Sequence, residues 1–264
     1  MSDFLCIFHL PTPGDRGKGV GYLAAMKIAD IEYEFDGQTM FGHFAVDEYR
    51  VGPRPAVLLC HEGPGLDEHV KGRAVRLAGL GYAAFALDYQ GGSRPIEESM
   101  TRLNVLMADA ELTRRLARAG LDVLLAQPRV DPDRVAAIGY CFGGAMALEL
   151  ARSGADLGAV VGFHPGLGSP RPEDSSAITA SVLMCCGAED PVAPAEARLA
   201  FEVEMREAGF ADWRIELYGG VGHSFTNPRV DELGMPGFGF NAAADRRAWR
   251  SLLLLLDDTL GPVD

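Results

Sequence analysis

Residues 135–148 read VAAIGYCFGGAMAL. An apolar run ends just before Cys141 and a helix-forming segment begins at Phe142, so the pattern predicts a buried strand that turns sharply into a helix. Such a turn needs small residues two positions before and two positions after the nucleophile, because the strand and the helix approach closely there. Gly139 and Gly143 occupy these two positions. The stretch therefore has the pattern of a nucleophile elbow, with cysteine in the position usually held by serine.

Other short apolar runs precede and follow this stretch, separated by segments with helical periodicity. This alternation is typical of parallel strands that are buried on both faces of a sheet. The runs span residues 56–60, 82–87, 135–139, 158–163, 181–186 and 214–218. The helical segments span residues 68–80, 101–127, 142–153, 195–208 and 242–259. The order of these segments predicts an α/β protein.

An additional pair of strands is predicted nearer the N-terminus. Residues 28–35 and 39–46 alternate between apolar and polar side chains around Asp36-Gly37, which is a strong signal for a two-residue hairpin turn. The complete prediction is a mostly parallel central sheet with an N-terminal antiparallel hairpin at its edge and with helices on both faces.

Composition limits the partners that the chain can bind. The 264 residues include 24 Lys and Arg against 37 Asp and Glu, giving a formal charge of −13, which argues against binding to nucleic acid or to an anionic membrane surface. The apolar runs, of which residues 252–256 are the most hydrophobic, are far shorter than the roughly 20 residues that span a bilayer. We expect a small-molecule partner, with no nucleic acid and no membrane.

The chain length and the unbroken order of segments favour a single domain over residues 26–264. Residues 1–25 lack clear periodicity and are predicted to be an N-terminal extension, with Met26 a second candidate for the native first residue. Five scattered cysteines show neither a disulfide framework nor paired metal-ligand spacing, and no secretion signal is recognisable. We therefore expect a cytoplasmic protein with reduced thiols, either a monomer or a homodimer.

Two further strand ends carry groups that would complete a catalytic site with Cys141. In open parallel sheets, ligands bind at the carboxyl ends of the strands, and Asp190 and His223 follow the apolar runs 181–186 and 214–218. The chain order nucleophile, acid, histidine is that of the α/β-hydrolase arrangement. Each residue also has a plainer explanation, as a core cysteine, a helix cap and a surface-loop histidine. The coincidence of all three at strand ends favours a triad.

The position of Cys141 also bears on its reactivity. At a helix N-terminus, unpaired N–H groups and the helix dipole favour a thiolate over a thiol. The backbone N–H of Phe142 points to where an oxyanion would form.

Taken together, these segments resemble the dienelactone hydrolase family of α/β-hydrolases. The resemblance extends over about residues 27–258 and rests on GYCFGG at 139–144, GAEDP at 187–191, GHSF at 222–225 and His61-Glu62 after the first parallel strand. It implies a Cys-His-Asp hydrolase of esters or lactones, with Cys141, His223 and Asp190 as the triad.

The resemblance also implies supporting roles for the residues after the first parallel strand. Glu62 would contact the resting thiol and control its ionisation, although a solvated loop carboxylate is the plainer alternative. The Gly63 N–H would complete the oxyanion hole with Phe142.

Members of the family that cleave dienelactone hold the substrate carboxylate with arginines. Asn227 occupies the position expected for one of them, and Arg94 is a candidate for a second. His164 follows another strand end and is a candidate pocket residue, with a structural loop histidine as the alternative. Because Asn227 stands where an arginine is expected, a general carboxylesterase or lactonase is favoured over a carboxymethylenebutenolidase.

The function predicted from the sequence is hydrolysis of an ester or lactone through a thioester on Cys141, with no metal or organic cofactor. The alternative is a non-catalytic thiol redox sensor or binding protein on the same fold. Retention of His223 and Asp190 favours the enzyme.

Overall fold

The computed structural model describes residues 26–263, so the extension predicted for residues 1–25 lies outside the described residues. Eight strands form one sheet in the order β1-β2-β4-β3-β5-β6-β7-β8. Their bounds are β1 Met26–Phe35, β2 Gln38–Asp47, β3 Arg54–Cys60, β4 Ala83–Leu87, β5 Val130–Tyr140, β6 Ala159–Phe163, β7 Ser181–Gly187 and β8 Trp213–Tyr218. Strand β2 runs antiparallel to β1 and β4, and all other neighbouring strands are parallel. The predicted α/β class and edge hairpin are confirmed.

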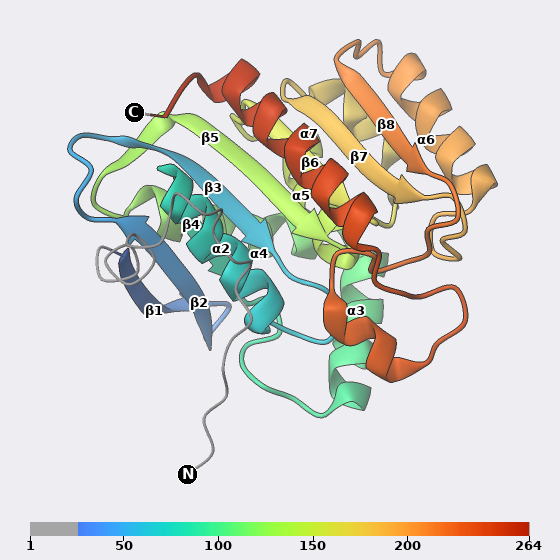
Figure 1. Ribbon diagram of the computed structural model, residues 1–264, viewed down its shortest axis with the longest axis horizontal. Helices are drawn as coiled ribbons and strands as arrows, with labels where there is room; N and C mark the ends of the chain where they lie inside the picture. The colour runs from blue at the N-terminus through green and yellow to red at the C-terminus, as the bar shows by residue number, and fades with distance from the viewer. Residues whose placement is uncertain (1–25, 264) are drawn as a thin grey trace, which may run out of the picture.

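Helices cover both faces of this sheet (Figure 1). They are α2 Glu68–Leu80, α3 Ile96–Ala108, α4 Ala110–Leu125, α5 Phe142–Arg152, α6 Ala195–Glu207 and α7 Ala242–Leu260, with 3-10 turns at Pro172–Ala177 and Pro228–Leu233. Buried residues of α4, α5 and α6 belong to one core cluster, and those of α2 and α7 belong to another. In β3, Ala56 and Leu58 join the first cluster while Val57 and Leu59 join the second. Burial on both faces explains why these strands have continuous apolar sequences.

The prediction of one helix over residues 101–127 is wrong. The chain forms α3 and α4 instead, and the break falls at Asp109, whose extended backbone (φ −122°, ψ 93°) ends the first helix. The Asp109 carboxylate accepts a hydrogen bond from the Leu112 N–H at 3.0 Å, so it caps α4. The apolar residues keep a helical spacing across Asp109, so the sequence pattern does not indicate the break. The break leaves α3 as a separate helix beside the candidate site.

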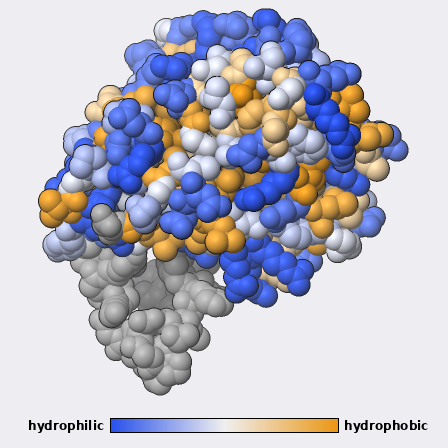
Figure 2. All heavy atoms as spheres, turned by 90° about the horizontal axis from the view of Figure 1, so that it is seen from above, coloured by the Kyte–Doolittle hydropathy of each residue, from blue (hydrophilic) through white to orange (hydrophobic). Residues whose placement is uncertain are grey.

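Hydrophilic side chains cover much of the face seen in Figure 2, and apolar residues form smaller groups among them. Between residues 26 and 263, no helix combines the length and the apolar character that crossing a bilayer requires.

Candidate active site

The turn between β5 and α5 has the geometry of a nucleophile elbow. Cys141 lies between the two elements with φ 54° and ψ −122°, a conformation that costs a non-glycine residue about 1–3 kcal/mol. Its N–H faces two acceptors, the Phe163 carbonyl at 3.0 Å and the Nδ1 of His164 at 3.1 Å. These contacts hold the strained turn in place beside the end of β6.

The two glycines of the elbow provide the clearance predicted from the sequence. A Cβ atom on Gly139 would lie 2.0 Å from the Gly143 carbonyl oxygen, and one on Gly143 would lie 2.2 Å from the Cys60 carbonyl oxygen. Both clashes involve backbone atoms, which cannot move aside as a flexible side chain can. The close packing of α5 on β3 and β5 therefore requires glycine at both positions.

Gly143→Ala is expected to lower the free energy of unfolding by about 3 kcal/mol or more, because the added methyl group forces α5 away from β3. The matched control is Gly72→Ala in α2, where a Cβ would meet nothing within 4 Å. That substitution should raise stability by roughly 0.5–1 kcal/mol. Urea denaturation of both variants measures the difference, and equal effects would contradict the packing account.

His223 and Asp190 form a buried pair at the carboxyl ends of β8 and β7. The Nδ1 of His223 lies 2.8 Å from the Oδ2 of Asp190, and the two residues are 1% and 2% exposed. The Oδ1 of Asp190 accepts hydrogen bonds from the N–H groups of Val192 and Ala193 at 2.7 and 3.3 Å. The carboxylate is thus fixed from both sides and orients the imidazole ring.

The remaining ring nitrogen of His223, Nε2, is buried and has no hydrogen-bond partner of regular geometry among residues 26–263. Burial by itself would lower the pKa of His223, but the hydrogen-bonded Asp190 carboxylate and the neighbouring Cys141 side chain outweigh it and raise the pKa to about 10. Cys141 and His223 also line the same cavity. The cysteine side chain and the His223–Asp190 pair therefore meet at one place.

The raised pKa of His223 predicts how stability depends on pH. A folded-state pKa of about 10 against an ordinary value of 6.5 means that the folded protein binds this proton more tightly than the unfolded chain does. The resulting stabilisation is fully present below pH 6.5 and disappears as the pH rises through 10. The stability gap between wild type and His223→Gln should therefore narrow between pH 6 and pH 10 in urea titrations. A gap that stays constant or widens would contradict the pKa assignment.

Glu62 is held by two donors on the loop that follows His223. The Ser224 hydroxyl donates to Oε1 at 2.7 Å and the Asn227 amide donates to Oε2 at 2.5 Å. Burial raises the pKa of Glu62, and these two hydrogen bonds offset part of the shift. Glu62 lines the cavity together with Cys141. It is therefore a half-buried, oriented carboxyl group rather than a solvated loop residue.

Asn227 also lines the cavity, but its polar atoms are already engaged. Its NH2 group donates a hydrogen bond to the Glu62 carboxylate, and its Oδ1 accepts a hydrogen bond from the Arg229 N–H at 3.1 Å. Sequence reasoning did not single out Ser224 as a partner of Glu62. The only available signal was its position directly after His223.

The loop that carries Gly63 is fixed by buried polar groups. The Tyr89 hydroxyl donates to the Glu62 carbonyl at 2.8 Å, and the Gln90 amide donates to the Gly63 carbonyl at 2.8 Å. His61 is fully buried and stacks on Tyr89 with the ring centroids 3.7 Å apart. Gly63 and Phe142 both line the cavity that contains Cys141. Phe142 is the first residue of α5, where backbone N–H groups lack helical acceptors.

His164 lies behind Cys141. The side chain is fully buried, its Nε2 lies 2.9 Å from the Thr226 hydroxyl, and its ring packs edge-on against His223 at 5.1 Å. Burial lowers the pKa of His164 well below its usual value, so the ring is neutral. The cavity lining does not include His164. This position does not support the substrate contact predicted for it, and favours a structural role in holding the Cys141 backbone.

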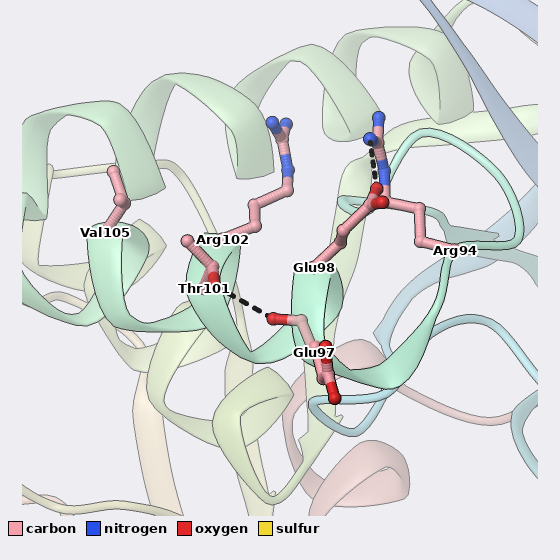
Figure 3. Close-up of a pocket in the computed structure, with 6 residues that line it drawn as sticks. All are labelled: Arg94, Glu97, Glu98, Thr101, Arg102 and Val105. Carbon is pink, nitrogen blue, oxygen red and sulfur yellow. Dashed lines mark hydrogen bonds and ion pairs between the residues drawn. The ribbon is translucent and has the colours of Figure 1, made fainter.

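Arg94 lies in the cavity wall at the start of α3. Its Nε donates to the Gln90 carbonyl at 2.5 Å, and its guanidinium group lies 4.0 Å from the Glu98 carboxylate. Figure 3 shows this pairing among the residues that line a second pocket, which also include Arg102. One of the five N–H donors of Arg94 is therefore used by the Gln90 carbonyl, and the Glu98 carboxylate lies at the limit of ion-pair distance.

The cavity around Cys141 has a volume of about 1110 Å³. Helix α3 forms one side, and the segment from Asn227 to Phe238, which includes the 3-10 turn Pro228–Leu233, forms another. Neither wall was predicted from the sequence. Within residues 26–263, no three His, Cys, Asp or Glu side chains are grouped as metal ligands would be.

A mostly parallel sheet with a strained nucleophile turn after β5, an acid after β7 and a histidine after β8 defines an α/β-hydrolase. Comparison with known proteins narrows this class. The chain belongs to the dienelactone hydrolase family, whose model matches residues 41–260. It is accordingly an ester or lactone hydrolase.

Several solved structures and curated proteins are similar to this chain. The structure of m3DLH is 45% identical, with a TM-score of 0.85, and the match covers 89% of this chain and 99% of that one. The dienelactone hydrolase-like promiscuous phosphotriesterase P91, from metagenomic libraries, is 40% identical, with a TM-score of 0.86 and coverage of 90% and 100%. A putative carboxymethylenebutenolidase of Yersinia pestis is 27% identical over 203 residues, which are 72% of this chain and 75% of the relative.

Proposed function

We propose that the protein hydrolyses a carboxylic ester or lactone through a thioester formed on Cys141. The observation that carries the proposal is the meeting of the Cys141 side chain with the buried His223–Asp190 pair in one large cavity. A strained turn at a helix N-terminus, a histidine and an orienting carboxylate are the parts that an activated nucleophile needs.

In the first half-reaction, the Cys141 thiol gives its proton to the Nε2 of His223, and the resulting thiolate attacks the substrate carbonyl carbon, whose oxygen becomes an oxyanion. The N–H groups of Phe142 and Gly63 stabilise that charge. The tetrahedral intermediate collapses with cleavage of the carbon–oxygen bond, and the departing alkoxide takes the Nε2 proton of His223. The products of this half-reaction are an alcohol and a thioester on Cys141.

In the second half-reaction, water replaces the alcohol. The Nε2 of His223 accepts a proton from the water molecule, and the water oxygen attacks the thioester carbon. Collapse of this intermediate breaks the carbon–sulfur bond and releases the carboxylic acid. Asp190 keeps the Nδ1–H of His223 directed toward itself, so that Nε2 faces Cys141 throughout.

Glu62 has the supporting role of controlling the ionisation of the resting thiol. Its half-buried carboxyl group lies in the cavity wall and is oriented by Ser224 and Asn227, which supports an electrostatic influence on the neighbouring sulfur. A negative carboxylate there opposes thiolate formation, whereas a protonated one does not.

A pre-steady-state assay with p-nitrophenyl acetate distinguishes the hydrolase from the alternative of a non-catalytic thiol sensor. The hydrolase is expected to release a burst of p-nitrophenol close to one equivalent per protein, or to show sustained turnover where deacylation is fast. A sensor would show neither, and would change only on treatment with an oxidant or alkylating agent at Cys141. Absence of both burst and turnover across short-chain esters and lactones would contradict the proposal.

Phosphate triesters are a second candidate substrate class, because the similar protein P91 is described as a promiscuous phosphotriesterase. A triester is uncharged, and the cavity wall here contains more carboxylates than guanidinium groups. Release of p-nitrophenol from diethyl p-nitrophenyl phosphate, lost in Cys141→Ala, would support this activity. Release that persists unchanged in that variant would contradict it.

A further inference from the structure

The cavity around Cys141 is large and mostly apolar beyond its reactive base. Its volume of about 1110 Å³ lies at the upper end of the roughly 300–1,000 Å³ typical of small-molecule sites. Leu103 and Leu106 of α3 line it, as do Val230 and Phe238 of the segment that follows His223. Space of this size and character accommodates a substrate much larger than a short-chain ester.

Large apolar side chains that are exposed to solvent gather at this cavity. Their exposed fractions are 57% for Ile96, 41% for Met100, 49% for Met107, 63% for Leu233 and 46% for Met235, and all five line the cavity. Exposed apolar residues are ordinary when scattered, but a group of them around one cavity marks a ligand surface. Methionine side chains adapt their shape to what they contact. The five side chains therefore form an apolar mouth above Cys141.

The charges in the wall do not favour an anionic substrate. Apart from His223 at the reactive base, the wall contains five carboxylates, those of Glu62, Asp67, Asp88, Glu149 and Glu232, and two guanidinium groups, those of Arg94 and Arg229. Glu149 is paired with the buried Arg114 and Arg152, which leaves four carboxylates against two guanidinium groups. Arg94 is engaged by the Gln90 carbonyl and lies near the Glu98 carboxylate. Arg229 is exposed, where an ion pair contributes little. Asn227 carries no charge and donates to Glu62.

We infer that the substrate is an uncharged ester with a bulky aliphatic or aromatic group, which lies in the mouth formed by α3 and residues 233–235. A lactone or ester that carries a free carboxylate is the disfavoured alternative. The inference rests on the proposed function, because the ester must reach Cys141. It adds the chemical class of the group that the cavity binds.

A matched pair of substrates tests the inference in the full-length protein. The acyl groups of p-nitrophenyl hexanoate and mono-p-nitrophenyl adipate differ in that a carboxylate replaces the terminal methyl group. We expect kcat/KM for the hexanoate to exceed that for the adipate by at least about tenfold, since the carboxylate loses water without gaining a cation. Between acetate and hexanoate, kcat/KM should rise by roughly two- to fourfold for each buried methylene group.

Variants of the mouth supply the second measurement. Met107→Gln and Leu233→Gln should each lower the hexanoate-to-acetate ratio of kcat/KM by about threefold or more, because each replaces an apolar contact by a polar one. The matched control is Leu254→Gln in α7, since Leu254 is 65% exposed and does not line the cavity. That variant should leave the ratio unchanged.

The possible outcomes separate this inference from the proposed function. Equal or faster turnover of the adipate, or a hexanoate-to-acetate ratio of kcat/KM that neither mouth variant changes, overturns the inference. The proposed function stands in that case if the acetate is still hydrolysed in a Cys141-dependent manner. If no ester is hydrolysed in a Cys141-dependent manner, both are overturned.

Discussion

Cys141→Ala is expected to lower kcat/KM for ester hydrolysis on the order of 10⁴-fold or more, because the alanine side chain cannot form the proposed covalent intermediate. The backbone of residue 141 is strained at φ 54° in both proteins, and alanine retains the Cβ, so the fold should be unchanged. Steady-state kinetics with a p-nitrophenyl ester measure the first effect, and thermal unfolding measures the second. Turnover close to that of wild type would assign the chemistry to another residue.

The control for this substitution is another cysteine. Cys185 lies in β7, is fully buried, and does not line the cavity. Cys185→Ala should cost about 1 kcal/mol of stability through lost packing, while activity stays within a few-fold of wild type. A comparable loss of activity in both variants would indicate that the effect of Cys141→Ala is not specific to the site.

Asp190→Asn is expected to lower kcat by about 10³- to 10⁴-fold, because it changes which ring nitrogen of His223 carries the proton. The asparagine Oδ1 can keep the hydrogen bonds from the Val192 and Ala193 N–H groups, which leaves Nδ2 facing His223. The ring must then accept at Nδ1 and carry its proton on Nε2. A neutral His223 in this state cannot take a proton from Cys141 or from water.

Asp131→Asn provides the matched control, because Asp131 lies near the start of β5, the strand that Cys141 follows. Its carboxylate pairs with Arg134 at 2.7 Å in a partly exposed position, and this ion pair contributes about 1 kcal/mol at most. Activity should be unchanged. Asp190→Asn protein that retains wild-type kcat would contradict the orienting role, whereas an unfolded variant would be recognised from its circular dichroism.

The reactive end of the sheet could be predicted because it depends on short-range patterns. Gly139 and Gly143 mark a turn that only small residues permit, and the structure shows the clashes that a Cβ would cause. Asp190 and His223 come within four or five residues of the ends of two apolar runs, and parallel strands bring their carboxyl ends to one edge. Local sequence and sheet topology together therefore placed these side chains near one another.

The walls of the cavity could not be predicted in this way. The cap at Asp109 lies inside an unbroken helical period, so α3 was joined to α4 in the prediction. The segment around the turn Pro228–Leu233 has no periodicity that would place it opposite α3. His164 follows a strand end as Cys141, Asp190 and His223 do, yet it turns inward to Cys141 N–H and Thr226. Contacts between segments distant in the sequence decide each of these cases.

The central claim is that an acyl group is carried by the sulfur of Cys141. It is tested by treating wild-type protein and His223→Gln with p-nitrophenyl butyrate, quenching in acid within the first turnovers and mapping peptides by mass spectrometry. The variant should accumulate the adduct, because p-nitrophenolate leaves without a proton whereas attack by water needs the base. The account predicts a butyryl group on the peptide that contains Cys141, removed by neutral hydroxylamine as a thioester. A butyryl group on another residue, or turnover with no adduct at Cys141 in either protein, would contradict it.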